Sequence, residues 1–415
     1  MSLFYSIFIR LYPLAIWLAS PFNQKAKLWT TGRKNIFSEL EKAIGKSTAP
    51  LVWMHCSSLG EFEQGRPVIE QLKLQNANSK ILITFFSPSG YEVRKNYELA
   101  DFVFYLPMDS AENAIQFFEI VKPHLIIFVK YEFWYHYLQE AKKRNIPFLL
   151  ISAVFRKNQS FFKWYSDFYR NLLTCFTHIF VQDENSVSLL NTINISNVSL
   201  SGDTRFDRVV EIANEVQSIE KLNNFIGNSK VIVAGSTWLE DDKELAHYAN
   251  TKTQIKFIIA PHVIGQDRLN ECLNLYKHSL LYSKLASITP LSINTIVIDN
   301  IGMLSQLYKY ATVAYVGGGF GGDGVHNVLE PAVFGKPVLI GPEFEKYVEA
   351  VDLVDTGGAI VVETTLDLEK ALDTLLQMDE NYKNICLTSK EFVENRVGAT
   401  KKVVDYIYKN RLLTS

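Results

Sequence analysis

The feature that most constrains the fold of this chain is a series of short, wholly apolar runs separated by longer helical stretches. The first series has runs at residues 51–56, 81–86, 125–129, 148–152, 178–181 and 198–201. Runs that lack polar alternation are typical of parallel strands whose two faces are both covered by helices. The sequence therefore predicts an α/β fold built on a parallel sheet.

A second series of apolar runs begins after a charged helical segment at residues 207–229. Its runs lie at 230–234, 256–260, 295–298, 313–316 and 337–340, and closing helices are predicted at 369–378 and 389–409. A chain of 415 residues has room for two or three domains of ordinary size. We therefore expect two doubly wound, Rossmann-like halves, one over residues 23–207 and one over residues 208–415.

The N-terminal segment, residues 1–22, is predicted to associate with a membrane. Residues 3–19 are almost wholly apolar and aromatic, interrupted by Arg10 and Pro13. Basic side chains follow at Lys25, Lys27, Arg33 and Lys34. A cleaved signal peptide has its positive charge before the apolar stretch, and Arg10 costs about 2.5–3.5 kcal/mol at the centre of a span. A short or tilted anchor and a helix lying in the interface both remain open, and a buried helix of a soluble domain is the alternative.

The overall charge and the cysteines exclude several classes of function. Lys and Arg number 42 against 44 Asp and Glu, so no global basic field favours nucleic acid. The four cysteines are far apart and form no Cys-x-x-Cys pair, which argues against a zinc site or a redox motif. A chain of this size does not need disulfides, and we expect a reducing compartment.

Two glutamates follow strands of the first series. Glu61, preceded by Gly60, comes after the run at 51–56, and Glu132 comes after the run at 125–129. Ligands of doubly wound sheets bind beyond the carboxyl ends of the strands, so two such carboxylates can converge on one site. One would act as a base and the other would orient it or a substrate. The alternative for Glu61 is a favourable interaction with a helix dipole and nothing more.

The strongest local signal is the stretch VGGGFGGDGVHNVLEP at residues 316–331. We predict a strand, then a phosphate-binding loop at Gly317–Gly319, then a helix whose first turns hold His326, Asn327 and Glu330. Glu330 can accept hydrogen bonds from both hydroxyls of a ribose. A flexible loop without a ligand is the alternative. The stretch is neither a P-loop nor a dehydrogenase fingerprint, and its place in the second half is typical of a nucleotide-sugar glycosyltransferase of the GT-B type.

Several motifs occur in the order seen in bacterial 3-deoxy-D-manno-octulosonic acid (Kdo) transferases, and the chain resembles that family over nearly its whole length. The motifs are HCSSLGE at 55–61, YEFW at 131–134, SGDTRFD at 201–207, AGST at 234–237, APH at 260–262 and GVHNVLEP at 324–331. The last motif and the SxGE element of the first are highly specific, and the others support them.

The resemblance implies a membrane-associated GT-B enzyme whose two Rossmann-like domains face one cleft. It would move Kdo from CMP-Kdo to a lipid A precursor (lipid IVA), with inversion, without a metal or another cofactor, at the cytoplasmic face of the inner membrane. Glu61 resembles the general base, and Glu132 and Arg205 resemble residues that stabilise the transition state. Donor binding would fall to Pro261, His262, Ile301, Gly302, Met303, His326, Asn327, Val328, Leu329 and Glu330, with Gly317, Gly318 and Gly319 as the phosphate loop.

Three departures from the family pattern matter. Many members carry Lys at the position of Arg205, where the charge survives. Ala260 stands where an Arg is usual before Pro-His, so a cationic contact to phosphate is missing or comes from elsewhere. Ile301-Gly302-Met303 replaces Met-Gly-Glu, which leaves only backbone contacts to the cytosine. The alternatives are another GT-B enzyme with a UDP-sugar, either glycosyltransferase or epimerase, and a non-catalytic, membrane-tethered binding protein.

Overall fold

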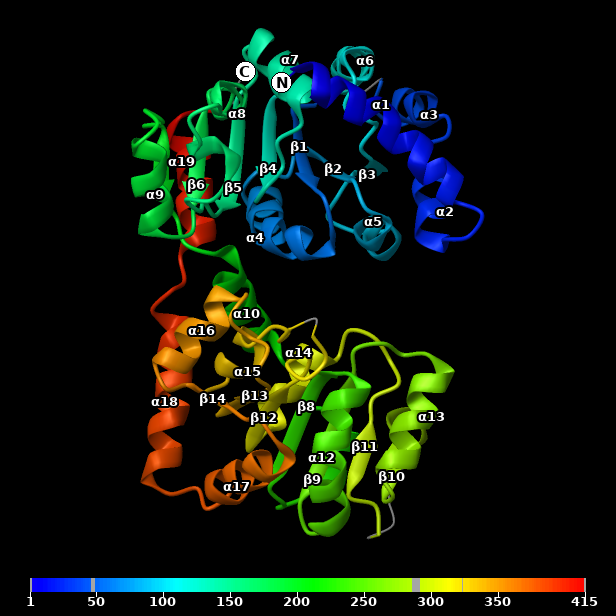
Figure 1. Ribbon diagram of the computed structural model, residues 1–415, viewed down its shortest axis with the longest axis vertical. Coiled ribbons are helices and arrows are strands. Elements are labelled where there is room, and N and C mark those ends of the chain that lie inside the picture. The colour runs from blue at the N-terminus through cyan, green and yellow to red at the C-terminus, as the bar shows by residue number, and fades with distance from the viewer. Residues whose placement is uncertain (1, 46–48, 286–291, 323, 414–415) are drawn as a thin grey trace. The chain divides into compact units, whose positions relative to one another are not determined.

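The computed structural model describes residues 2–45, 49–285, 292–322 and 324–413. Asp323 of the glycine-rich stretch lies outside the described residues. The chain divides into two compact units: a first unit of residues 1–208 with 397–415, and a second unit of residues 209–396. Each unit contains one seven-stranded parallel sheet, and the prediction of two parallel α/β halves is confirmed (Figure 1).

The sheet of the first unit has the strand order β3-β2-β1-β4-β5-β6-β7. Its strands are β1 (Leu51–Cys56), β2 (Lys80–Phe85), β3 (Phe102–Tyr105), β4 (Leu125–Val129), β5 (Phe148–Ala153), β6 (His178–Val181) and β7 (Val198–Leu200). Its helices are α1 (Ser2–Ala19), α2 (Gln24–Thr31), α3 (Ile36–Ile44), α4 (Leu59–Gln75), α5 (Pro88–Arg94), α6 (Ala111–Val121), α7 (Tyr135–Lys143), η1 (Ser160–Phe162), α8 (Asp167–Leu173), α9 (Glu184–Asn191) and α19 (Ala399–Lys409), and α10 (Thr204–Glu215) runs on into the second unit.

The central strand β1 shows why its sequence is apolar throughout. Its six residues are all buried. Leu51 and Trp53 belong to one core cluster, whereas Val52 and Met54 belong to another. Successive side chains of a strand point to opposite faces, so the two clusters lie on the two faces of the sheet. Both faces are covered, as parallel connections require.

The sheet of the second unit has the order β10-β11-β9-β8-β12-β13-β14. Its strands are β8 (Val231–Thr237), β9 (Lys256–Pro261), β10 (Ser279–Leu281), β11 (Thr295–Val297), β12 (Val313–Val316), β13 (Val338–Ile340) and β14 (Ala359–Val361). Its helices are α11 (Glu220–Ile226), α12 (Leu239–Thr251), α13 (Gln266–Leu275), η2 (Tyr282–Lys284), α14 (Leu304–Leu307), η3 (Tyr308–Tyr310), α15 (Leu329–Ala332), α16 (Val348–Asp355), α17 (Thr365–Leu375) and α18 (Glu380–Glu394).

Three strands escaped the sequence prediction: β3, β10 and β14. Each lies at an edge of its sheet, and each has only three or four residues. The prediction passed over the apolar runs FVFYL at 102–106 and AIVV at 359–362, which are at least as long as the run at 178–181 that it used. Three of the four side chains of β3 are only half-buried, because a strand at the edge of a sheet is covered less than a central one.

The C-terminal helices differ from the prediction. One helix was expected at 389–409, but α18 ends at Glu394 and α19 starts at Ala399, after Gly398 in a left-handed conformation (φ 109°). The division at residue 207 placed α19 with the second half, whereas it lies in the first unit, beside β6 in Figure 1. Asp207 accepts hydrogen bonds from the amides of Gly398 (2.5 Å) and Thr400 (2.7 Å) and so caps α19.

The N-terminal helix α1 packs along the first unit by one face. Ile9 is buried, and the ring of Tyr12 contacts those of Trp29 and Phe86 with centroids 5.6 and 5.8 Å away. Tyr5 donates a hydrogen bond to Asp109, which also accepts from two amides at the start of α7. None of the helices in the described part of the chain is both long and apolar enough to cross a membrane.

In both sheets the strand order reverses once near the centre. The reversal falls between β1 and β4 in the first unit and between β8 and β12 in the second. Ligands of doubly wound sheets bind at the carboxyl edge beside this reversal. The loops that follow these four strands are therefore the first places to look for function.

Candidate active site

Glu61 lies in the first turn of α4, directly after β1. Its Oε2 accepts hydrogen bonds from the backbone N–H (2.7 Å) and the hydroxyl (3.0 Å) of Ser58, so the carboxylate is held back against the helix start. Burial raises the pKa of Glu61, and the nearby charge of Glu132 raises it further. A carboxylate that is harder to ionise is better suited to take a proton near neutral pH.

Glu132 follows β4 and is only 7% exposed. Its Oε2 accepts a hydrogen bond from Trp134 Nε1 (2.5 Å) and lies 3.2 Å from His55 Nε2. Because the charge of Glu132 acts on Glu61, the structure brings the two glutamates that flank the strand reversal into one electrostatic neighbourhood. Their roles remain predictions.

From the sequence, no role was assigned to His55 and Trp134, although both lie in the quoted motifs. Their contacts with Glu132 make them functional candidates. His55 is the fifth residue of β1 and is fully buried. Its Nδ1 lies 3.0 Å from the carbonyl oxygen and 2.9 Å from the hydroxyl of Thr84. The ring is thereby fixed between β2 and Glu132.

Arg205 is paired with Asp203 at the start of α10. Its guanidinium donates to Asp203 Oδ2 from Nε (2.9 Å) and from a terminal nitrogen (2.7 Å). The neighbouring Thr204 donates to the carbonyl oxygen of Gln64 in α4 at 2.5 Å. The start of α10 therefore packs on the helix that carries Glu61, with the guanidinium partly exposed.

Arg33, one of the basic residues that follow the apolar segment, is held by contacts inside the first unit. It donates to the carbonyl oxygens of Leu106 (2.9 Å) and Phe86 (2.8 Å), and its guanidinium lies 4.1 Å from the ring centroid of Trp29. These contacts make Arg33 part of the packing between α2 and the sheet. It is not a surface cation that can seat a substrate.

The glycines at 317–319 serve close packing in the second unit. The Gly317 amide donates to the carbonyl oxygen of Gly235 (2.9 Å), and the Gly318 amide donates to Asp241 (2.9 Å). A Cβ on Gly319 would lie 2.6 Å from Cα of Gly341. The amides of the first two glycines already have partners in this conformation, and phosphate binding by this loop stays a prediction. The sequence shows the glycines but not which backbone approaches them.

The predicted helix after the glycine loop is much shorter than expected. Only Leu329–Ala332 is helical, and His326 and Asn327 precede it in an irregular loop. The Asn327 side chain accepts from the Leu329 amide (3.2 Å) and donates to Glu330 (3.2 Å). Val328 and Leu329 are fully buried, so they can offer a ligand only their backbone.

Three rings stack at the carboxyl edge of the second sheet: Trp238 after β8, His262 after β9 and His326 after β12. The His262 and His326 rings are nearly parallel (11°) with centroids 4.3 Å apart, and Trp238 lies 4.8 Å from His262. Trp238 Nε1 also donates to His326 Nε2 at 3.1 Å. The structure thus unites two predicted donor-binding residues and adds Trp238, which the sequence analysis missed.

The remaining donor candidates precede and follow His262 in the sequence. Pro261 is the buried last residue of β9. Ile301 is 89% exposed, and Gly302 has a positive φ (93°), in the loop between β11 and α14. A Cβ on Gly235 would overlap Leu304 of α14, so this glycine lets the loop's helix pack on β8, beside the strand reversal.

Among the described residues, no three His, Cys, Asp or Glu side chains form a group that could hold a metal ion. The sequence-based expectation of metal independence stays a prediction.

Known proteins resemble this chain over most of its length. The family model for 3-deoxy-D-manno-octulosonic-acid transferase (kdotransferase) matches residues 32–208, which include Glu61, Glu132 and Arg205. A 3-deoxy-D-manno-octulosonic acid transferase of Rickettsia typhi is 28% identical over 381 residues, covering 88% of this chain and 79% of that protein. A protein of the same description from Haemophilus influenzae is 26% identical over 377 residues and covers 86% of each chain.

Solved structures share the architecture. The UDP-GlcNAc 2-epimerase of Neisseria meningitidis, solved with UDP-GlcNAc bound, superposes with a TM-score of 0.61 at 20% identity and covers 87% of this chain and 100% of its own. At this identity the likeness shows the fold alone, which is the two-domain GT-B fold. By its sequence relatives, which resemble it over most of its length at 26–28% identity, the chain is similar to the 3-deoxy-D-manno-octulosonic acid transferases, and these relatives indicate a glycosyltransferase.

Proposed function

We propose that the chain transfers Kdo from CMP-Kdo to a lipid A precursor, with inversion at the anomeric carbon and without a bound metal. The observation that carries the proposal is the pair of carboxylates after β1 and β4, in which Glu132 raises the pKa of Glu61. The relatives, which are described as 3-deoxy-D-manno-octulosonic acid transferases, support the identity of the sugar.

Glu61 acts as the general base in this proposal. Its raised pKa brings it closer to neutrality, where a base takes a proton most effectively. The acceptor oxygen forms a bond to the anomeric carbon while the bond from that carbon to the phosphate oxygen breaks. The proton passes to Glu61, and the bonding electrons leave with CMP. Glu132, held by Trp134 and His55, stabilises the positive charge that develops on the sugar.

The leaving phosphate needs positive charge on the donor side. Ala260 supplies none where the family usually has an arginine. The stacked rings of His262 and His326 lie at the carboxyl edge of the second sheet, next to the loop after β12. We assign the phosphate contact to ring N–H groups of this histidine pair, which donate hydrogen bonds in place of the missing charge, while His326 Nε2 accepts from Trp238 and is held in place by it. Asn327 and Glu330 bind the ribose.

The membrane role is proposed from the exposed face of α1. Phe8, Leu11, Leu14, Trp17 and Leu18 are 51–59% exposed, although the opposite face of the helix packs on the first unit. A helix with this arrangement lies in the interface with its apolar side chains among the lipids. We place the protein at the cytoplasmic face of the inner membrane, where it meets its lipid acceptor.

The test is mass spectrometry of the lipid product after incubation with CMP-Kdo and lipid IVA. We expect the mass of the acceptor to rise by one or more Kdo units. Glu61→Gln should give no product and still bind CMP, whereas Glu63→Gln, two residues later in α4 and ion-paired with Arg94 (2.6 Å), should stay active. Normal transfer by Glu61→Gln would refute the base assignment.

The donor is tested by thermal stabilisation. A ligand that binds only the folded protein raises its melting temperature. CMP should therefore raise it, and UDP at the same concentration should not. Stabilisation by UDP alone would favour a UDP-sugar enzyme instead.

A further inference from the structure

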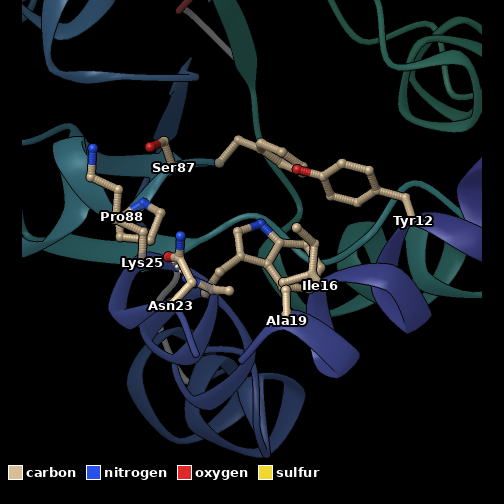
Figure 2. A pocket seen from close by; sticks show the side chains of 10 residues that line it. Tyr12, Ile16, Ala19, Asn23, Lys25, Ser87 and Pro88 are labelled. Carbon is tan, nitrogen blue, oxygen red and sulfur yellow. Dashed lines mark hydrogen bonds between the residues drawn. The ribbon is translucent and has the colours of Figure 1, made fainter. Parts of the chain in front are cut away.

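An apolar groove of about 310 Å³ opens between α1, α2 and the loop after β2 in the first unit. Figure 2 shows Tyr12, Ile16 and Ala19 of α1 along one side, and Ser87 and Pro88 on the other, beside Asn23 and Lys25. A volume of about 300 Å³ is at the lower end of small-ligand sites. The groove is thus large enough for a slender apolar ligand.

The groove contains a buried donor without a partner. Trp29 lines it and is 7% exposed, and its Nε1 has no hydrogen-bond partner among the described residues. The guanidinium of Arg33 stacks over the indole ring, so the ring is fixed in place. An unsatisfied buried N–H is costly and rare, and here it indicates a ligand that carries an oxygen.

Packed side chains link the groove to the candidate active site. Phe86 lines it and packs on Trp134 with ring centroids 4.7 Å apart, and Trp134 in turn donates to Glu132. The next residue, Ser87, donates its amide to the carbonyl oxygen of Ser57 (2.7 Å), in the turn that precedes Glu61. Phe86 and Trp134 therefore separate a ligand in the groove from Glu132, and the turn at Ser57 links the groove to the start of the helix that carries Glu61.

The surroundings of the groove match a lipid. Ile16 and Ala19 line it from α1, and the neighbouring Trp17 and Leu18 of the same helix are more than half exposed as part of its apolar face. Apolar side chains of α1 therefore line the groove and continue onto the exposed face of the same helix. Lys25 lines the groove beside Ser87 and complements an anionic headgroup.

We propose that this groove binds one acyl chain of the lipid acceptor, with Trp29 Nε1 donating to an oxygen of the acyl group. The proposal rests on the proposed function, since it identifies the part of the acceptor that the first unit recognises. The groove holds the acyl chain, Lys25 faces the headgroup, and Phe86 sets the distance from the chain to the carboxylates.

The first experiment does not need transferase activity. A C12 fatty acid with a diazirine is photo-crosslinked to the full chain, and the labelled peptides are identified by mass spectrometry. We expect label on α1, α2 or the loop at 86–88, and competition by lipid IVA. Ala19→Trp, which fills the groove, should abolish this label. Leu18→Trp, about 100° around the helix, should leave it unchanged. Label elsewhere, or equal label in Ala19→Trp, would overturn the proposal.

The second experiment measures transfer to lipid IVA. Trp29→Phe removes only the N–H and the larger ring, and we expect KM for lipid IVA to rise about fivefold, as for one lost hydrogen bond, with kcat little changed. Trp164→Phe, the same change at a side chain that is 90% exposed, should leave KM unaltered. An unchanged KM in Trp29→Phe would exclude the hydrogen bond. If the wild-type chain transferred nothing, the proposed function would fail, but the crosslinking would still decide the groove.

Discussion

Replacement of Trp134 by phenylalanine tests whether Glu132 is held as the structure indicates. The Trp134 ring packs on Phe86 with centroids 4.7 Å apart, and a phenylalanine keeps most of this packing. It removes the N–H that donates to Glu132 Oε2 at 2.5 Å. Glu132 is 7% exposed, so little water can replace the lost donor, and His55 Nε2 at 3.2 Å is the contact that remains.

The magnitude follows from the charge of the acceptor. A hydrogen bond to a charged group contributes about 1.5–3 kcal/mol to stability, against about 0.5–1.5 kcal/mol for a neutral pair. A domain of this size loses about 2–4 °C of Tm per kcal/mol, so Trp134→Phe should lower the Tm of the first unit by about 3–12 °C. In a Glu132→Gln background the same change should cost only the neutral value.

Differential scanning calorimetry of the wild type, Trp134→Phe, Glu132→Gln and the double variant gives the coupling energy between Trp134 and Glu132. Trp164→Phe is the matched control, because Trp164 is 90% exposed and its replacement should leave the Tm unchanged. A Tm for Trp134→Phe within about 1 °C of wild type, or an equal loss in both backgrounds, would refute the charge-assisted bond.

Three further predictions concern pH, packing and capping. Glu132→Gln removes a charge that raises the pKa of Glu61. The rise of kcat/KM that accompanies deprotonation of Glu61 should therefore shift to lower pH. An unchanged acidic limb of the pH–rate profile would contradict this prediction. Gly319→Ala places a Cβ 2.6 Å from backbone after β13 and should destabilise the second unit by about 1–3 kcal/mol by calorimetry, whereas Gly265→Ala meets nothing within 4 Å and should not. Asp207→Ala removes the cap of α19 and should cost about 0.5–2 kcal/mol in urea unfolding; unchanged stability would show that the cap is dispensable.

Several features of the fold follow from local sequence patterns. The central strands are buried on both faces, so their apolar runs predict them, with the bounds of β1 and β4 as observed and the end of β8 three residues too early. The edge strand β14 was missed although residues 359–362 form a short apolar run. The placement of α19 was also missed, because its buried face and the Asp207 cap depend on contacts almost two hundred residues apart in the chain.

The candidate residues show the same division. Parallel connectivity places every loop that follows a strand at one edge of a sheet, which is why Glu61 and Glu132 could be selected from sequence. Their electrostatic coupling requires β1 and β4 to be neighbours, and the strand order settles this only in the folded protein. Likewise, the pairing of His262 with His326 depends on which loops the second sheet brings together.

The sequence by itself therefore determined the α/β class, the two series of strands, the family resemblance and the identity of the chemically useful side chains, since these depend on local pattern and residue type. The tertiary structure decided that the glycines at 317–319 pack against backbone, that Arg33 is half-buried against the Trp29 ring, and that Trp29 lines a groove while its N–H has no partner among the described residues. The physical reason is that burial and partner choice are properties of contacts between distant segments, which no local pattern records.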